Sequence, residues 1–193
     1  MSNRTFVFEG YDYEPLSGEA VFRYSFDGQR QFIEKATFVP SSNYNQLVFD
    51  RVLRLCFFVI GTSYYKCFPT RKVKFVDQCL TPLDAKILNA IYRDGLSQFV
   101  FENSLDPNVL ARFEPDIEQI EPLGYDPEGV VIMQSGGKDS LLLAQLISEL
   151  AVEYTPWFMS QSDHHPVVLD ALGAKPLRQV RRVVDVDAIR QAR

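Results

Sequence analysis

Residues 130–140 read Val-Val-Ile-Met-Gln-Ser-Gly-Gly-Lys-Asp-Ser, a short apolar strand that leads into a glycine-containing turn. An apolar helix, residues 141–150, follows the turn. Glycines let the backbone turn without a Cβ in the way, and the first N–H groups of a helix are unpaired and lie at the positive end of its dipole. Because such an arrangement binds anions, the stretch predicts a phosphate-binding loop at the start of an α/β nucleotide-binding unit.

The side chains of this loop suit a nucleotide polyphosphate. Lys138 adds a positive charge, Ser135 and Ser140 add hydroxyl donors, and the carboxylate of Asp139 could orient the loop or hold a magnesium ion. An ordinary tight turn between a strand and a helix is the structural alternative. The predicted cofactor-binding residues are Ser135, Gly136, Gly137, Lys138, Asp139 and Ser140.

Two common glycine motifs do not match, because the loop lacks both the Gly-x-x-x-x-Gly-Lys-Ser/Thr spacing and the Gly-x-Gly-x-x-Gly spacing. The loop resembles instead the Ser-Gly-Gly-x-Asp-Ser loop of the PP-loop ATP pyrophosphatase superfamily. That resemblance implies ATP and Mg²⁺ as cofactors, pyrophosphate held in the loop and AMP transferred to a substrate oxygen. It also implies catalytic roles for Lys138 and Asp139, with Asp139 as a magnesium ligand.

Composition narrows the class of protein. The chain has 193 residues, of which 46% are hydrophobic, which is enough for a buried core. A net charge of −5 argues against a general nucleic-acid binder. No apolar run approaches the length of a membrane span, and the N-terminus lacks the apolar core of a signal peptide. We therefore expect a cytoplasmic protein that binds neither nucleic acid nor membrane; its oligomeric state stays open.

The number and spacing of the cysteines are typical of a protein in a reducing compartment. Cys56, Cys67 and Cys79 are odd in number, form no Cys-x-x-Cys pair and lie in or beside apolar runs. They are expected to be buried free thiols.

The N-terminal part predicts an antiparallel meander followed by helices. Three segments alternate apolar and polar residues and are separated by turn sequences, of which Asp27-Gly28 is a hairpin signal: 5–13, 19–26 and 31–39. An amphipathic helix is predicted from Asn43 to Gly61, and a strand at 73–76. A second helix has Thr81 as its cap, Asp84 three residues later and Gly95 at its end.

After an acidic, proline-containing segment, 114–128, which suits a linker, the pattern becomes α/β. Helices and strands are expected to alternate in this part, at 140–150 (helix), 152–159 (strand), 165 or 166 to 172 (helix) and 177–184 (strand), with a further helix beginning before residue 193. So few parallel strands would leave apolar faces uncovered, which predicts that the chain is the N-terminal part of a longer protein or a truncated copy of one. The predicted fold is an α+β N-terminal domain (1–126), followed by the start of a truncated α/β parallel-sheet PP-loop domain (127–193).

Two sequence segments in the N-terminal part narrow the resemblance from a superfamily to one family. Residues 57–66 read Phe-Phe-Val-Ile-Gly-Thr-Ser-Tyr-Tyr-Lys and residues 92–99 read Tyr-Arg-Asp-Gly-Leu-Ser-Gln-Phe. Together with the meander before them and the Ser-Gly-Gly-Lys-Asp-Ser loop after them, they resemble the UDP-N-acetylmuramoyl-L-alanyl-L-glutamate epimerase family over nearly the whole chain. Proteins of that family continue well beyond residue 193, so catalytic groups in their later part have no counterpart here.

The family resemblance implies ATP-dependent epimerisation of the terminal L-glutamate of a UDP-sugar peptide, a precursor of peptidoglycan. Adenylation would remove the negative charge of the carboxylate and supply a carbonyl into which the carbanion can delocalise. A side chain could then remove the α-proton and the same or another one return it to the opposite face. The loop would hold the leaving pyrophosphate, with Lys138 neutralising charge on the bridging oxygen.

Two further segments are candidate functional sites, and each has a structural alternative. Tyr64, Tyr65 and Lys66 could face the UDP-sugar peptide, or the tyrosines could form a core edge. The segment 163–165, Asp-His-His, follows a predicted strand; it could serve a metal or acid–base site, although a helix-start or surface role is favoured.

Five basic residues could meet an anionic substrate. Arg71 and Lys72 could steer it, whereas Arg178, Arg181 and Arg182 could contact phosphate or lie on a solvated strand edge.

Other functions stay open. One is another adenylating PP-loop enzyme, either a ligase or a tRNA-modifying enzyme, although paired cysteines and a basic face for RNA are absent from the sequence. The other is a non-catalytic nucleotide-binding module.

Overall fold

Alternating aromatic side chains on three N-terminal strands build the apolar face of a sheet. The computed structural model describes residues 4–39, 44–118, 124, 129–162, 167, 169 and 178–192. Strands β1 (Phe6–Glu14), β2 (Glu19–Phe26) and β3 (Arg30–Thr37) pair antiparallel in sequence order, which confirms the predicted meander. Asp27 and Gly28 both have positive φ, 57° and 69°, as a tight hairpin turn requires.

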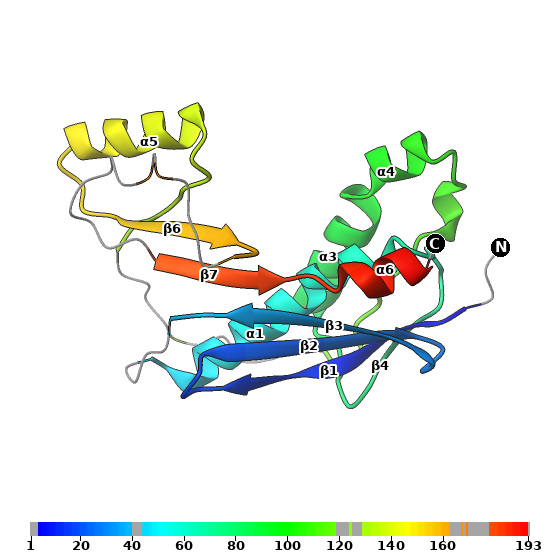
Figure 1. The fold of residues 1–193 in the computed structure, drawn as a ribbon. Coiled ribbons are helices and arrows are strands. Elements are labelled where there is room, and N and C mark those ends of the chain that lie inside the picture. Colours follow the sequence, from blue (N-terminus) through cyan, green and yellow to red (C-terminus); the bar gives the residue numbers. More distant parts are fainter. Residues whose placement is uncertain are drawn as a thin grey trace.

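Helices cover the apolar face of the meander (Figure 1). Helix α1 (Gln46–Ile60) begins where the Asn45 side chain accepts a hydrogen bond from the Val48 amide, and the short α2 (Thr62–Tyr65) follows it. Strand β4 (Val73–Phe75) returns parallel to β1. The predicted amphipathic helix before Gly61 and the predicted strand at 73–76 are therefore both confirmed.

The second predicted helix is divided into two pieces. Helix α3 (Pro82–Asn89) has the expected capping box at Thr81 and passes into a π-helical turn, η1 (Ala90–Asp94), before Gly95. Two elements were not predicted, α4 (Ser97–Glu102) and the 3₁₀ turn η2 (Pro107–Val109). No side chain caps α4, so the sequence carries no start signal for it.

The C-terminal part contains the expected strand–helix–strand order. Strands β5 (Val131–Met133), β6 (Thr155–Ser160) and β7 (Arg178–Val183) are parallel, α5 (Lys138–Glu149) connects the first two, and α6 (Val186–Ala192) follows the last. Most of the predicted helix at 165 or 166 to 172 and most of the predicted linker lie outside the described residues.

One seven-stranded mixed sheet joins the two parts, in the order β4-β1-β2-β3-β7-β6-β5. The junction is antiparallel: Lys35, Ala36 and Thr37 of β3 pair with Val183, Arg182 and Arg181 of β7. Beyond β7 the backbone amide of Ile33 donates to the side chain of Asp185, just before α6. A domain boundary at residue 126 stays a prediction, but the sheet itself runs through both predicted domains.

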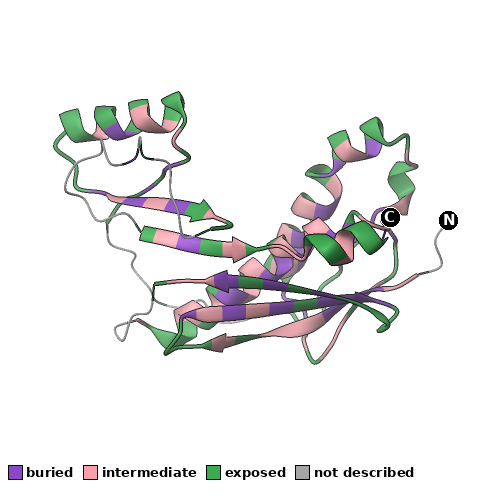
Figure 2. Ribbon diagram, viewed as in Figure 1, coloured by how far each residue is buried: buried purple, intermediate pink, exposed green. Residues whose placement is uncertain are grey.

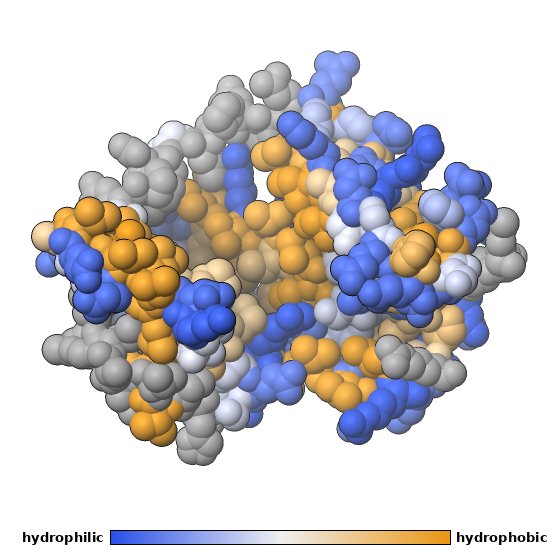
Figure 3. Space-filling view, turned by 90° about the horizontal axis from the view of Figure 1, so that it is seen from above, coloured by the Kyte–Doolittle hydropathy of each residue, from blue (hydrophilic) through white to orange (hydrophobic). Residues whose placement is uncertain are grey.

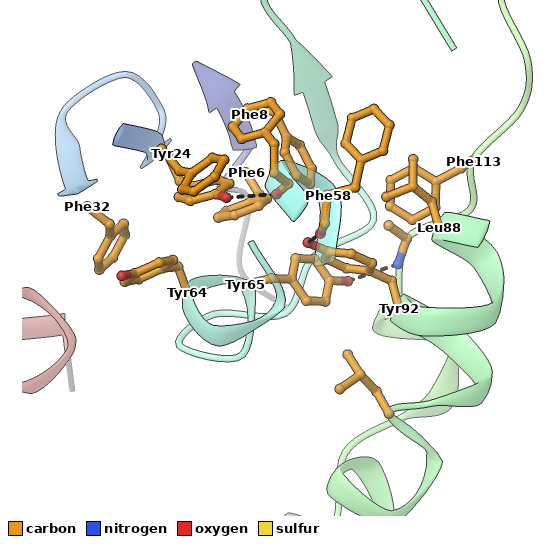
Figure 4. Close-up of a cluster of buried hydrophobic side chains, with 14 of the residues drawn as sticks. Phe6, Phe8, Tyr24, Phe32, Phe58, Tyr64, Tyr65, Leu88, Tyr92 and Phe113 are labelled. Carbon is orange, nitrogen blue, oxygen red and sulfur yellow. Dashed lines mark hydrogen bonds between the residues drawn. The ribbon is translucent and has the colours of Figure 1, made fainter. Parts of the chain in front are cut away.

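Buried residues gather between the meander and α1–α3 (Figure 2), and many of them are aromatic rings (Figure 4). Tyr24 and Tyr92 are fully buried, and their hydroxyls donate to the carbonyl oxygens of Phe57 and Phe58 at 2.7 and 2.8 Å. These carbonyls lie in the last turn of α1, where backbone N–H partners run out, and Phe57 O accepts in addition from the Gly61 amide at 3.3 Å. The two tyrosines therefore bury large rings in the core, and their hydroxyls donate hydrogen bonds to carbonyl oxygens at the C-terminal end of α1.

Gly61 lies where these rings meet, directly after α1. Its φ and ψ are −53° and −24°, so it adopts an ordinary helical conformation rather than the left-handed one common at helix ends. A Cβ at this position would approach Tyr92 Oη to 2.7 Å and Phe8 Cε1 to 2.9 Å. The helix ends at Gly61 as predicted, but glycine is required here for close packing and not for its flexibility.

The cysteines are free thiols, as predicted, but they are less buried than expected. Cys56 and Cys67 are half-buried at the edge of the aromatic core, and Cys79 is exposed. Burial raises the pKa of the Cys56 thiol, which keeps that side chain protonated and apolar in character.

The C-terminal part of the sheet, β5 and β6 with α5, has a smaller buried core than the N-terminal part. A small cluster of Ile132, Ala144 and Tyr154 holds α5 to β5. Apolar side chains gather over α5 on the outside (Figure 3), and Val131 and Met133 of β5 are 64% and 68% exposed. The exposed leucines of α5 and of the turn after it are Leu142, Leu143, Leu146 and Leu150. These faces agree with the prediction that the parallel strands would be incompletely covered.

Among the described residues, no helix combines the length and the apolar character that a membrane crossing requires.

Candidate functional site

The Ser135–Ser140 loop connects the end of β5 to the start of α5. The Gln134 amide donates to Trp157 O at 2.7 Å, which extends the parallel pairing to the first residue after β5. Gly136 has a φ of +77°, a conformation that residues with a Cβ rarely adopt. Gly137 is the N-cap of α5, and no side chain caps the helix. The predicted strand–turn–helix context of the motif is therefore present.

The loop presents free donors at the start of a twelve-residue helix. The first intrahelical bond runs from the Leu141 amide to Gly137 O at 3.2 Å. Within the part of the chain that the structure describes, the amides at 138–140 have no hydrogen-bond acceptor. The side chains of Lys138 and Asp139 are exposed at the same place. Free amides, a helix dipole and one ammonium group suit a phosphate group.

The two serines are held within the loop. The Ser140 hydroxyl donates to Gly137 O at 2.9 Å, and Ser135 Oγ accepts from the Gly137 amide at 3.4 Å. The Ser135 hydroxyl also donates to Ser140 Oγ at 3.4 Å; because Ser135 is exposed and both of its bonds are long, its hydroxyl is the freer of the two to contact a ligand.

Gln134 is a residue of this site that was not predicted. It is 2% exposed, and its Nε2 donates to Ser140 O at 3.2 Å, which links the end of β5 to the first turn of α5. Its Oε1 is buried and has no partner among the described residues. A polar residue directly after an apolar strand was the available signal. Gln134 positions the loop.

The residues present fit ATP with magnesium only if phosphate oxygens complete the metal shell. Within the described ranges, no three His, Cys, Asp or Glu side chains form a cluster that could hold a metal ion. Asp139 is an exposed single carboxylate beside the free amides. Mg²⁺ is commonly held by one or two carboxylates together with substrate phosphates, so Asp139 suits that limited role.

Tyr64 and Tyr65 are both fully buried and both hydroxyls are used inside the protein. Tyr65 Oη donates to Thr70 O and accepts from the Ala111 amide, each at 2.9 Å. Lys66 alone of the predicted triplet is exposed. The tyrosines therefore occupy the core position that was the alternative interpretation, and contact of Tyr64, Tyr65 and Lys66 with substrate stays a prediction.

A buried polar cluster joins the two parts of the sheet beside Tyr64. The Glu34 side chain is fully buried; its Oε1 pairs with Arg182 Nε, and its Oε2 accepts from Tyr64 Oη at 2.7 Å. Arg182 Nη2 also donates to Ser63 Oγ at 3.2 Å. Burial, reinforced by the neighbouring Glu34 charge, raises the pKa of Tyr64 well above its ordinary value. Arg182 is thus an internal ion-pair partner on a strand inside the sheet, so its predicted place on a solvated strand edge is wrong, whereas its contact with phosphate stays a prediction.

Of the other basic candidates, Arg178 pairs with Trp157 of β6, whose carbonyl oxygen accepts from the Gln134 amide just before the loop. Arg178 is exposed, whereas Arg71 lines a cavity beside η1 and η2 with Arg93 and Arg112. The segment 163–165 lies outside the described residues, so its predicted metal, acid–base or helix-start roles stay predictions.

The chain is similar to known proteins along nearly its whole length. A model of the MurL N-terminal domain family matches residues 1–193. UDP-N-acetyl-alpha-D-muramoyl-L-alanyl-L-glutamate epimerase of Salinispora tropica is 30% identical over 191 residues, covering 92% of this chain and 41% of the relative. The protein of the same name from a Micromonospora species is 27% identical over 191 residues, covering 92% and 42%.

A third relative of that name, from Xanthomonas oryzae pv. oryzae, is 24% identical over 159 residues, covering 78% of this chain and 35% of the relative. The chain thus spans about two fifths of the length of the curated relatives it matches most fully. No solved structure matches it. Since the family model covers every residue from 1 to 193, the chain belongs to the MurL N-terminal domain family.

Proposed function

We propose that the protein takes part in the ATP-dependent epimerisation of the terminal L-glutamate of UDP-N-acetylmuramoyl-L-alanyl-L-glutamate, a step in making peptidoglycan precursors. The observation that carries this proposal is the Ser135–Ser140 loop at the uncapped start of α5, in a chain whose relatives are named as epimerases of this compound. Neither feature suffices alone, because the loop indicates a phosphate ligand and the names indicate a substrate.

In this proposal the loop binds the β- and γ-phosphates of ATP. The free amides at 138–140 and the Ser135 hydroxyl donate to phosphate oxygens, and the Lys138 ammonium balances the charge that grows on the bridging oxygen as pyrophosphate leaves. Asp139 would contribute one oxygen to a magnesium ion, which would supply further charge neutralisation. Gln134 keeps the loop in register with α5 through its bond to Ser140 O.

Adenylation makes chemical sense for epimerisation. A proton next to an ionised carboxylate is hard to remove, because the carbanion would form beside a negative charge. An acyl-adenylate has lost that charge, and its carbonyl accepts the developing electron pair. A base can then remove the α-proton and an acid return one to the opposite face, after which hydrolysis releases AMP.

The test uses the gene product that carries residues 1–193, incubated with ATP, Mg²⁺ and UDP-N-acetylmuramoyl-L-alanyl-L-glutamate. We expect AMP and pyrophosphate in solution and D-glutamate after acid hydrolysis of the peptide, separated by chiral chromatography. Lys138→Ala should lower kcat by about 10²-fold, whereas Lys86→Ala, an exposed lysine on α3, should not.

Other products would contradict the proposal in distinct ways. ADP and phosphate in place of AMP and pyrophosphate would exclude the PP-loop reaction. AMP without D-glutamate would indicate another adenylating enzyme. ATP binding that Lys138→Ala abolishes, with no turnover of any kind, would favour the nucleotide-binding module.

A further inference from the structure

A second cationic site lies in the N-terminal part, away from the Ser135–Ser140 loop. A cavity of about 400 Å³ is lined by three arginines, Arg71, Arg93 and Arg112, together with Asn108 and Leu110. The arginines come from three places in the chain: the segment before β4, the π-helical turn η1 and the segment after η2. Three separate segments therefore bring like charges to one cavity.

Nothing in the described part of the chain neutralises these three side chains. None of them forms an ion pair with a described carboxylate. The hydrogen bond found for the group is from Arg71 Nε to Asn108 O, which fixes the guanidinium and leaves its terminal nitrogens as donors. The chain as a whole carries a charge of −5, so a local excess of three positive charges is not a consequence of general basicity. Mutually repelling cations at one cavity indicate an anionic ligand that binds between them.

The shape of guanidinium groups favours phosphate. Each presents a planar fork of N–H donors, which matches two oxygens of one phosphate group. Three forks around one cavity can contact more than one phosphate group. A diphosphate therefore suits this arrangement better than a single carboxylate.

An apolar pocket continues from the arginine cavity. It has a volume of about 630 Å³ and shares Arg93 and Leu110 with it, while Val100, Phe101 and Leu105 form much of its wall. Phe101 is 84% exposed, and an accessible aromatic ring is a surface on which a base can stack. Asp94 adds a carboxylate and Ser97 a hydroxyl at the same pocket, groups that can accept a hydrogen bond from the N–H of a base. Its volume falls within the range of about 300–1,000 Å³ found for small-molecule sites.

We propose that the arginine cavity holds the diphosphate of a uridine diphosphate-linked substrate and that the adjoining pocket receives the uracil. This inference rests on the proposed function, from which the uridine comes, whereas the diphosphate comes from the geometry. The two nucleotides of the reaction then bind at different places. ATP binds at α5, and the nucleotide end of the sugar peptide binds between η1 and η2.

The π-helical turn supports the placement of Arg93. A π turn inserts an extra residue in a helix and redirects the side chains that follow, and such turns are frequent at functional sites. Here it spans Ala90–Asp94 and buries Tyr92 against the core while Arg93 faces the cavity.

The test is isothermal titration calorimetry with UDP, on the wild type and on Arg93→Met and Arg112→Met. We expect UDP to bind the wild type and each substitution to weaken it about tenfold or more, with an affinity that falls as salt rises. The matched control is Arg23→Met, which removes a guanidinium paired with Asp12 on β1 and should leave UDP affinity unchanged. Unfolding midpoints of all variants show whether the fold is kept.

The outcomes separate this proposal from the proposed function. No UDP binding, or equal binding by wild type and arginine variants, would overturn the site even if epimerisation were observed. ADP binding as tightly as UDP at the same arginines would overturn the uridine assignment. In the epimerase assay, the arginine variants should raise KM for the sugar peptide and leave KM for ATP unchanged, whereas Lys138→Ala should lower kcat. If UDP binding requires the arginines but the protein has no epimerase activity, the diphosphate site is supported and the proposed function is wrong.

Discussion

At the scale of single residues, Gly61 shows how strictly the aromatic core limits side-chain volume. Gly61→Ala should lower the free energy of unfolding by about 2 kcal/mol, because the new Cβ would lie 2.7 Å from Tyr92 Oη and 2.9 Å from ring atoms of Phe8 and Tyr24. Urea denaturation measures this change. Gly124→Ala is the control, since a Cβ there meets nothing within 4 Å. Equal stability of the two variants would mean that the rings move aside freely.

The buried tyrosines predict a loss of stability in alkali. Burial raises the pKa of Tyr24, Tyr64 and Tyr92 above the ordinary value of 10.0. The folded state thus holds these phenolic protons more tightly than the unfolded chain does. Their stabilising contribution is complete below pH 10 and is lost as the pH rises from 10 through the folded-state values.

Unfolding free energies measured at a series of alkaline pH values, with tyrosinate absorbance followed in parallel, check this prediction. Tyr92→Phe should reduce the slope of stability against pH. Ionisation of all tyrosines near pH 10 in a protein that stays folded would contradict it.

At the scale of elements, α3 depends on its capping box. The Thr81 side chain accepts from the Asp84 amide at 3.1 Å, and the Asp84 carboxylate accepts from the Thr81 amide at 3.0 Å. Thr81→Ala should cost about 1 kcal/mol, while Thr81→Ser should keep most of the stability. Denaturation of the two variants under the same conditions makes the comparison. If alanine and serine behave alike, the hydroxyl does not stabilise the helix.

Elements with local signals could be predicted from the sequence. The short Asp27-Gly28 turn fixes the register in which β2 pairs with β3. The Thr81 side chain marks the start of α3 in the same local way. Helix α4 escaped prediction because Leu96 precedes it without a capping side chain. The loop at 135–140 was recognisable for the same local reason, since the groups that we propose to bind phosphate are contiguous in the sequence.

Features that depend on distant contacts could not be predicted. The arginine cavity is assembled from residues 71, 93 and 112, and no spacing in the sequence relates them. Glu34 was a partial exception: it interrupts the inward-facing apolar positions of β3, between Phe32 and Ala36. That pattern signals a buried charge but does not name its partner, which is 148 residues away.

At the scale of the whole molecule, the Glu34–Arg182 pair ties the meander to the parallel strands. The Glu34 side chain is fully buried and the Arg182 side chain is 29% exposed. Arg182→Met should cost about 3 kcal/mol, because it leaves a buried carboxylate without its counterion. The double variant with Glu34→Leu should be less destabilised than Arg182→Met alone, since no unpaired charge remains.

A double-mutant cycle in urea measures the coupling. Arg23→Met is the control, because its partner is largely exposed and surface pairs are worth about 0–1 kcal/mol. Independent effects of the two substitutions would show that the pair does not couple the two parts of the sheet.

The antiparallel junction of β3 with β7 also has a consequence for how the chain is made. A ribosome produces β3 long before residues 181–183, with which Lys35, Ala36 and Thr37 pair. During that interval the nascent meander carries an open strand edge, which invites pairing with other chains. Contacts so distant in sequence also slow folding. The exit of Val183 from the ribosomal tunnel, rather than completion of the aromatic core, is then the event that ends this period of vulnerability.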